Sequence, residues 1–274
     1  FSFKISAAGE FYVDWGDGKR QTITKPDTTN TTYSHTYSTS KSYTIKLTGQ
    51  ATAYNTGTST AAISFYVNSS QTKIASIDGS LGAIFGTLSS DTNNQPRFYN
   101  TFYNAYNMTG SIPANLFAGI SGAPASYMFA YTFYRCSGLT GAIPDGLFGN
   151  LTGAPASYMF YKTFYGCSGL TGAIPDGLFG NLTGAPASNM FRETFSGCSK
   201  LTSIPENLFG GISGPAQGDM FKGTFYNCTS LTGPSARING QYLYEIWNAS
   251  LWATYKGCTG LSDYSSIPYD WLDN

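Results

Sequence analysis

The chain has 274 residues, of which only 11% are charged, while Gly, Tyr and Phe are unusually frequent. Fifteen Lys and Arg balance fifteen Asp and Glu, and neither sign forms a run, so the composition argues against binding to nucleic-acid phosphates. No apolar stretch reaches the roughly 18 residues of a membrane-spanning helix. We therefore expect neither nucleic-acid binding nor membrane insertion.

The chain begins at Phe1, without an initiator Met or a charged-then-apolar leader. We expect a processed mature form or a piece of a longer protein. Its low charge and high Gly and Tyr content are unlike those of an ordinary cytosolic protein. These features favour an extracellular or cell-surface location.

The first seventy residues alternate apolar and polar side chains in short runs separated by Gly, Asp, Asn and Ser. Such alternation is typical of half-buried β-strands. The runs are residues 1–5, 10–15, 21–24, 42–49 and 62–67. They predict a small antiparallel β-sandwich over residues 1–70.

Two segments of this region, FYVDWGDGKRQTI at 11–23 and YSHTYSTSKSYTIKLTG at 33–49, closely resemble the polycystic kidney disease (PKD) domain family. The resemblance implies an immunoglobulin-like sandwich in which His35 packs beside Trp15. Some PKD-like domains bind calcium, which makes Asp14 and Asp17 candidate metal ligands. Independently, Asp17 and Gly18 are typical of a hairpin turn whose Asp side chain bonds to the turn backbone. We expect a structural role for these residues rather than a required metal.

From residue 71 onward the chain repeats itself. The Thr that precedes an aromatic residue recurs with steps of 31, 31, 31, 30 and 30 residues, at Thr101, Thr132, Thr163, Thr194, Thr224 and Thr254. Residues 132–162 and 163–193 differ at only four positions, so at least part of the array arose by duplication. This period predicts about six stacked repeats over residues 71–274, with terminal caps at 71–100 and 265–274.

Within one repeat, the spacing of Met159, Phe160, Phe164 and Cys167 favours a short helix over residues 157–165. The following LTGAIP, residues 170–175, predicts one short strand that ends at its Pro. PDGLFGNL, residues 175–182, predicts a helical turn.

The string TFYGCSGLTGAIPDGLF, at 163–179, resembles the BspA-like leucine-rich repeats of bacterial surface proteins, and the resemblance covers about residues 98–270. It implies a parallel strand in each repeat. The expected fold is therefore a PKD-like β-sandwich followed by an α/β leucine-rich-repeat-type solenoid.

Five cysteines occupy one equivalent position in successive repeats: Cys136, Cys167, Cys198, Cys228 and Cys258, with Ala105 in the first repeat. A zinc site or a nucleophilic cysteine needs a neighbouring histidine or a close second cysteine, and this pattern offers neither. We expect buried, reduced thiols that fill equivalent apolar positions, with disulfides between neighbouring repeats as the alternative.

No pattern in the chain predicts catalysis or a cofactor. Asp145 and Asp176 are the same repeat position, and two identical environments do not give the two different pKa values that an acid and base pair needs. The G-x-S-x-G, H-E-x-x-H and phosphate-loop motifs do not occur. We therefore expect a non-enzymatic protein without a cofactor.

The four differences between the two near-identical repeats fall on one face of the predicted helix, which predicts that this face is outside. In the earlier repeats it carries Tyr99, Tyr127, Tyr131, Tyr158 and Tyr161, and in the later ones Arg192, Glu193, Asp219 and Lys222. A row of exposed tyrosines favours a contact surface for sugar or protein, and ordinary solvated tyrosines remain the alternative.

The sequence leaves several functions open. The first is adhesion or assembly at the cell surface, with other surface proteins, glycans or copies of the chain as partners, and with filament formation as one form of assembly. The second is a carbohydrate-binding accessory module of a larger secreted hydrolase, where PKD-like modules are common. A third, ice binding, rests on one rank of threonines: Thr109, Thr140, Thr171, Thr202 and Thr232.

Overall fold

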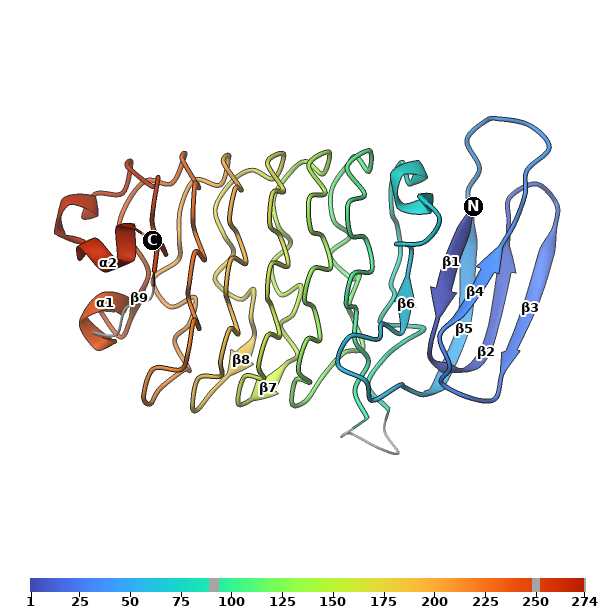
Figure 1. Ribbon diagram of the computed structural model, residues 1–274, viewed down its shortest axis with the longest axis horizontal. Coiled ribbons are helices and arrows are strands. Elements are labelled where there is room, and N and C mark those ends of the chain that lie inside the picture. Colours follow the sequence, from blue (N-terminus) through green and yellow to red (C-terminus); the bar gives the residue numbers. More distant parts are fainter. Residues whose placement is uncertain (89–93, 248–251, 274) are drawn as a thin grey trace.

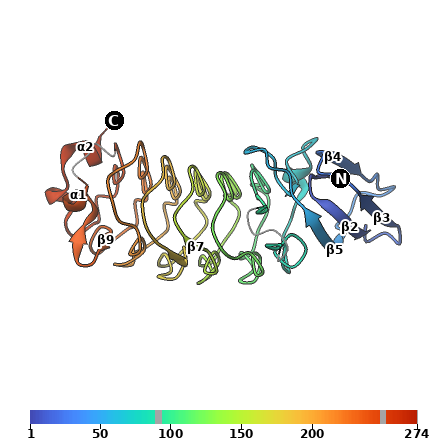
Figure 2. The same ribbon diagram turned by 90° about the horizontal axis from the view of Figure 1, so that it is seen from below.

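The structure is a computed structural model that describes residues 1–88, 94–247 and 252–273. The molecule is elongated: short β-sheets form its N-terminal end, short helices form its C-terminal end, and a row of coils connects them (Figure 1). Each coil corresponds to one sequence repeat, and the coils lie side by side along the long axis (Figure 2). We call this row, residues 98–262, the repeat stack.

Two three-stranded antiparallel sheets form the N-terminal end, with strand orders β4-β1-β6 and β3-β2-β5. The strands are β1 (Ser2–Ile5), β2 (Ala8–Asp14), β3 (Arg20–Lys25), β4 (Thr31–Ser34), β5 (Lys46–Ala53) and β6 (Ile63–Ser64). Phe3 on β1 lies against Trp15, which follows β2, with ring centroids 5.7 Å apart. The strands predicted from the sequence overlap all of these except β4. The β4 sequence TTYS is as polar as the turn before it, so no strand was predicted there.

Backbone hydrogen bonds of two kinds alternate along the first part of each repeat. Phe133 N donates to Thr163 O of the next repeat at 2.9 Å, whereas Thr132 N donates to Phe129 O, three residues earlier, at 3.2 Å. The same alternation recurs in the neighbouring repeats. Alternate residues therefore either join the coil to its neighbour or close tight turns within the coil.

The predicted helix over residues 157–165 is wrong, because the backbone turns into the left-handed region at every fourth residue. Tyr158, Lys162 and Gly166 have φ of 60°, 54° and 71°, and equivalent residues of other repeats behave in the same way. An α-helix requires negative φ throughout. Between residues 98 and 242, all of which the structure describes, the chain forms no helix.

The predicted strand in each repeat is also largely absent. LTGAIP forms a single parallel bridge, as between Gly141 and Leu170, and PDGLFGNL forms tight turns instead of a helical turn. Regular pairing within the stack is limited to the two-residue strands β7 (Thr152–Gly153) and β8 (Asn181–Leu182), among the residues described up to 236. The α/β leucine-rich-repeat solenoid expected from the sequence is therefore wrong: the chain consists of small sheets and coils with very little helix.

Columns of stacked phenylalanines fill the core of the repeat stack. Equivalent rings of neighbouring repeats lie nearly parallel, with centroids 5.5 to 5.7 Å apart in the Phe133–Phe164–Phe195 column. The three columns contain Phe98, Phe129, Phe160, Phe191 and Phe221; Phe102, Phe133, Phe164, Phe195 and Phe225; and Phe117, Phe148, Phe179 and Phe209. Burying one Phe side chain contributes about 1.5 to 3 kcal/mol, so these columns are the main source of stability.

The buried core runs without interruption from the sheets into the repeats. Phe65 N, next to β6, donates to Thr101 O of the first repeat at 2.9 Å. The domain boundary near residue 70 stays a prediction, and η1 (Ser70–Lys73) lies at this junction.

Buried aromatic side chains cover the C-terminal end of the core. At the C-terminal end, Trp247 and Trp271 cover the phenylalanine columns, next to the short elements of the tail. These are β9 (Arg237–Ile238), β10 (Gln241–Tyr242), α1 (Leu243–Ile246), η2 (Tyr264–Ser266) and α2 (Tyr269–Leu272). In the N-terminal sheets, the buried Lys25 ammonium donates to Asp27, Thr29 and Thr31 and so joins β3 to β4. Among the described residues, no helix has the length and apolar character that crossing a membrane requires.

Candidate functional site: the tyrosine face

The hairpin between β2 and β3 engages both candidate metal ligands. Asp14 accepts a hydrogen bond from Gly16 N at 2.9 Å and pairs with Arg20 at 3.1 Å, and these contacts lower its pKa. Asp17 accepts from Lys19 N at 3.0 Å and contacts His35 Nε2 at 2.8 Å, and the bond to His35 is the main cause of its lowered pKa. Both carboxylates therefore serve the turn.

The ring of His35 stacks on the buried Trp15, with centroids 4.9 Å apart and an angle of 16° between the rings. Gly18, with φ of 87°, takes the left-handed position of the turn. Within residues 1–88, 94–247 and 252–273, no group of three or more His, Cys, Asp or Glu side chains could hold a metal ion.

The five cysteines form a buried column of free thiols. Each Sγ donates to the carbonyl oxygen of a phenylalanine in the preceding repeat, as Cys167 does to Phe133 O at 3.0 Å. The other pairs are Cys136 with Phe102, Cys198 with Phe164, Cys228 with Phe195 and Cys258 with Phe225. Burial raises the pKa of every one of these thiols, which keeps them protonated and unreactive.

A second buried column consists of the threonines that define the repeat period. Thr163 Oγ1 donates to Phe129 O of the preceding repeat at 2.9 Å, and the equivalent threonines repeat this contact. Sequence reasoning used these threonines only as markers of the period. Their exact recurrence was the available signal that they are buried and hydrogen-bonded.

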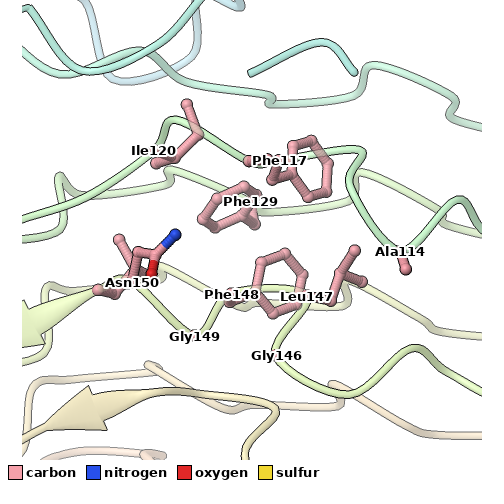
Figure 3. Close-up of a pocket in the computed structure, with 11 residues that line it drawn as sticks. Ala114, Phe117, Ile120, Phe129, Gly146, Leu147, Phe148, Gly149 and Asn150 are labelled. Atoms are coloured by element: carbon pink, nitrogen blue, oxygen red, sulfur yellow. The ribbon is translucent and has the colours of Figure 1, made fainter. Parts of the chain in front are cut away.

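Two small cavities lie between neighbouring coils. Phe117, Phe129 and Phe148 line the first, together with the turn at Gly149 and Asn150 (Figure 3). Its volume is about 70 Å³, and that of the second, beside Phe179 and Phe209, is about 50 Å³. Ligand pockets usually enclose about 300 to 1,000 Å³, so neither cavity can hold a small-molecule substrate.

Tyrosines gather on one outer side of the repeat stack, and we call this surface the tyrosine face. It consists of Tyr99, Tyr103, Tyr127, Tyr131, Tyr134, Tyr158, Tyr161 and Tyr165, all half-buried. Tyr127, Tyr131 and Tyr158 occupy left-handed positions, with φ of 59°, 58° and 60°. A bulky residue in the left-handed region is destabilising by about 1 to 2 kcal/mol, whereas Gly adopts this conformation without that cost. Equivalent positions in later repeats are occupied by Asn189, Asp219 and Gly223.

The rings of the tyrosine face contact one another, some stacked and others edge to face. Tyr127 stacks on Tyr158 with centroids 4.6 Å apart and an angle of 5°, and Tyr134 stacks on Tyr103 at 4.6 Å and 7°. Tyr134 also stacks on Tyr165 at 4.9 Å. Both faces of the Tyr134 ring are therefore covered by neighbouring rings.

Charged side chains adjoin the C-terminal end of the tyrosine face. Lys162 Nζ lies 5.2 Å from the Tyr161 ring centroid, and Arg192 Cζ lies 5.7 Å from the same centroid. Arg192 also pairs with Asp219 at 2.7 Å, and Glu193 pairs with Lys162 at 3.4 Å. The surface therefore changes from aromatic to charged along the stack.

The five tyrosines that the sequence predicted as exposed on a helix face are half-buried and lie on turns, and their role as a contact surface stays a prediction. Sequence reasoning missed Tyr103, Tyr134 and Tyr165 because it identified the outer face from positions that differ between repeats, and Tyr134 and Tyr165 are identical. Asp145, Asp176 and the rank from Thr109 to Thr232 are exposed on other parts of the coils.

Comparison of the chain with protein-family models, with curated proteins and with solved structures finds no match. The resemblances to PKD domains and to BspA-like repeats therefore stay predictions.

Proposed function

We propose that the protein is a non-enzymatic extracellular surface protein that acts in adhesion or assembly through its tyrosine face. A stack of similar coils spreads its contacts along one surface, so that each repeat adds a small and similar contribution to binding. Tyrosine suits such a surface because it combines a flat apolar area with a polar tip. The small cavities favour surface contact over the binding of a substrate in a pocket.

The observation that carries the proposal is the bulky side chain at left-handed positions. Tyr127, Tyr131 and Tyr158 take a backbone conformation that is unfavourable for them and that Gly or Asn adopts more readily. Contact between two tyrosine rings contributes about 0.5 to 1.5 kcal/mol, which offsets the cost of the left-handed backbone. This gain does not explain why tyrosine, and not Gly or Asn, occupies the position. Left-handed positions recur throughout the repeats, so the signal is the choice of Tyr at three of them and not the backbone conformation itself.

Ring geometry favours protein partners over sugars. A sugar typically stacks its apolar side on an open aromatic face, and neighbouring rings cover both faces of Tyr134. Half-buried tyrosines that pack on one another instead suit packing and hydrogen bonds with protein side chains. The role of a carbohydrate-binding accessory module therefore has less support than adhesion or assembly.

A triple variant, Tyr127→Asn, Tyr131→Asn and Tyr158→Asn, tests the proposal. Asn tolerates the left-handed conformation, so we expect the fold to be kept and circular dichroism to be unchanged. The fluorescently labelled chain would be applied to immobilised bacterial cells and to insoluble cellulose and chitin. We expect the variant to lose at least about tenfold of the binding to cells.

Tyr12→Asn is the matched control, because Tyr12 is 47% exposed on β2, outside the tyrosine face. It should bind as the parent chain does. A folded triple variant with the parent's binding to cells would contradict the proposal. Binding to the polysaccharides alone, if lost in the triple variant, would favour the carbohydrate-binding role instead.

A further inference from the structure

We propose that the partner of the tyrosine face is a second copy of this chain, which docks face to face and antiparallel through a two-fold axis. The inference rests on the proposed function and specifies its partner. It starts from the change of character along the tyrosine face and from the contacts that join the two parts of the surface.

The outward positions of the stack divide into two halves. The aromatic half is the tyrosine face itself, from Tyr99 to Tyr165. The charged half continues the same columns of positions with Arg192, Glu193, Asp219 and Lys222, while Tyr226 keeps a tyrosine in the column of Tyr165. Tyr158 is equivalent to Asn189, Tyr161 to Arg192, and Tyr165 to Ser196. One surface therefore changes from aromatic to charged at the boundary between two repeats.

Contacts between charged groups and tyrosines already occur at this boundary. Arg192 and Lys162 both lie against the ring of Tyr161, and Lys162 also lies 5.3 Å from the centroid of Tyr165. Beyond the boundary, Lys222 lies 5.7 Å from the centroid of the exposed Trp252. A cation is attracted to the face of an aromatic ring even at an exposed site. Contacts between the cations of one copy and the tyrosine rings of another would therefore be favourable.

The orientation follows from matching the two halves. Two copies that face each other in parallel would place Arg192 opposite Arg192 and Lys222 opposite Lys222, and such like-charge contacts are unfavourable. In the antiparallel arrangement, the charged half of each copy lies over the aromatic half of the other. Guanidinium and ammonium groups can then donate to phenol oxygens of the tyrosine face, as Arg237 donates to Tyr242 within the chain. A two-fold axis makes both contact zones identical.

Two variants separate the zones, and each uses residues that occur at equivalent positions of other repeats. The aromatic-half variant is Tyr127→Asn, Tyr134→Ser and Tyr158→Asn, because Asn189 and Ser196 occupy the equivalent positions in a later repeat. The charged-half variant is Arg192→Ala and Lys222→Ala, because Ala130 occupies the equivalent position in the second repeat. Tyr12→Asn is again the control.

Sedimentation velocity of the full chain measures self-association. We expect the parent and the control to form a dimer, with at least about tenfold weaker association for either variant alone. Association of the parent should also weaken when ionic strength is raised from about 0.05 to 0.5 M, because salt screens the charged contacts.

The decisive measurement is an equimolar mixture of the two variants carrying different fluorophores. Each homodimer of a variant has lost both zones, whereas the mixed dimer keeps one intact zone, so the mixture should associate more tightly than either variant alone. A monomeric parent, or a mixture that associates no better than its components, overturns the two-fold dimer. Binding to cells is measured separately, so a monomeric parent that still binds cells through the tyrosine face leaves the proposed function standing.

Discussion

Side-chain donors at individual buried residues hold neighbouring coils in register. The carbonyl oxygen of Phe129 accepts from Thr132 Oγ1 at 2.8 Å within its own repeat and from Thr163 Oγ1 at 2.9 Å across to the next. Phe133 O accepts from Cys167 Sγ at 3.0 Å. Because a buried hydroxyl or thiol needs an acceptor, and each of these finds one on the neighbouring coil, the threonines and cysteines favour one register over its alternatives.

We expect the cysteine column to lower the stability of the protein at alkaline pH. Burial raises the pKa of Cys198 from 9.0 to about 12, so its thiol stays protonated in the folded chain while the thiol of the unfolded chain ionises above pH 9. The folded state then binds more protons, and stability falls as pH rises from 9 towards 12. The loss is about 1.4 kcal/mol per pH unit for one thiol. Below pH 9 the contribution is fully present.

Urea denaturation at pH 8 and at pH 10 measures this effect. Cys198→Ala should show a smaller loss of stability between the two pH values than the parent, by about 1.4 kcal/mol. Ala105 shows that the position accepts alanine. Cys198→Ala removes only this thiol and leaves the tyrosines, which also titrate in this range, in place. An unchanged pH dependence in Cys198→Ala would show that the thiol is not protected from ionisation.

At the scale of the structural element, the sequence could predict the repeat but not its conformation. The 31-residue period follows directly from the sequence, and the inward residues Phe160, Phe164 and Cys167 are buried as their spacing indicates. Spacing of four residues is close to the 3.6 residues of a helical turn, so inward side chains at this spacing fit both a helix and a chain of tight turns. The left-handed positions decide between the two, and they carry Tyr, Lys or Glu as often as Gly.

The candidate site was predictable in part for a related reason. Sequence differences between the repeats identify an outer surface because buried positions tolerate little change, and three of the four differences fall on the left-handed positions: Arg135/Gly166, Tyr158/Asn189 and Lys162/Glu193. Ring stacking depends on the distance between coils. The sequence of one repeat does not indicate the distance between neighbouring coils. The stacking of Tyr134 between Tyr103 and Tyr165 could therefore not be predicted.

Replacing Arg135 distinguishes the chain of turns from a helix. Arg135 is exposed with φ of 56°, and the next repeat has Gly166 at this position. Arg135→Gly should be more stable than Arg135→Ala by about 1 kcal/mol, because only Gly adopts this conformation without strain. In the interior of a helix the order would be reversed by a similar amount.

Thermal or urea denaturation of both variants gives the order. Tyr161 provides the matched control on the same segment, since its φ is not among the positive values. There, Gly should be no more stable than Ala. An Ala variant of Arg135 that is the more stable of the pair would contradict the turn conformation.

At the scale of the whole molecule, stability is shared between neighbouring coils. Each phenylalanine column passes through successive repeats, and the two ends of the stack differ, with Trp247 and Trp271 at one and the N-terminal sheets at the other. In such an array each coil contacts mainly its two neighbours. We therefore expect that a coil in the middle can be deleted without loss of the fold, provided that its two neighbours stack in register. Deletion of either end structure should prevent folding.

Deleting residues 163–193 tests this view, because it joins Lys162 directly to Thr194, which is equivalent to Thr163. Phe133 can then stack on Phe195, and Phe160 on Phe221, as each does on its present neighbour. We expect a folded, shorter chain whose free energy of unfolding is lower by about 2 to 5 kcal/mol, from the usual stability per residue. Deleting only residues 163–177 places Leu178 after Lys162, shifts every column out of register and should prevent cooperative unfolding. Circular dichroism and urea denaturation compare the two. If the 31-residue deletion also failed to fold while the parent folds, the coils would not be exchangeable, and stability would depend on contacts that extend beyond neighbouring repeats.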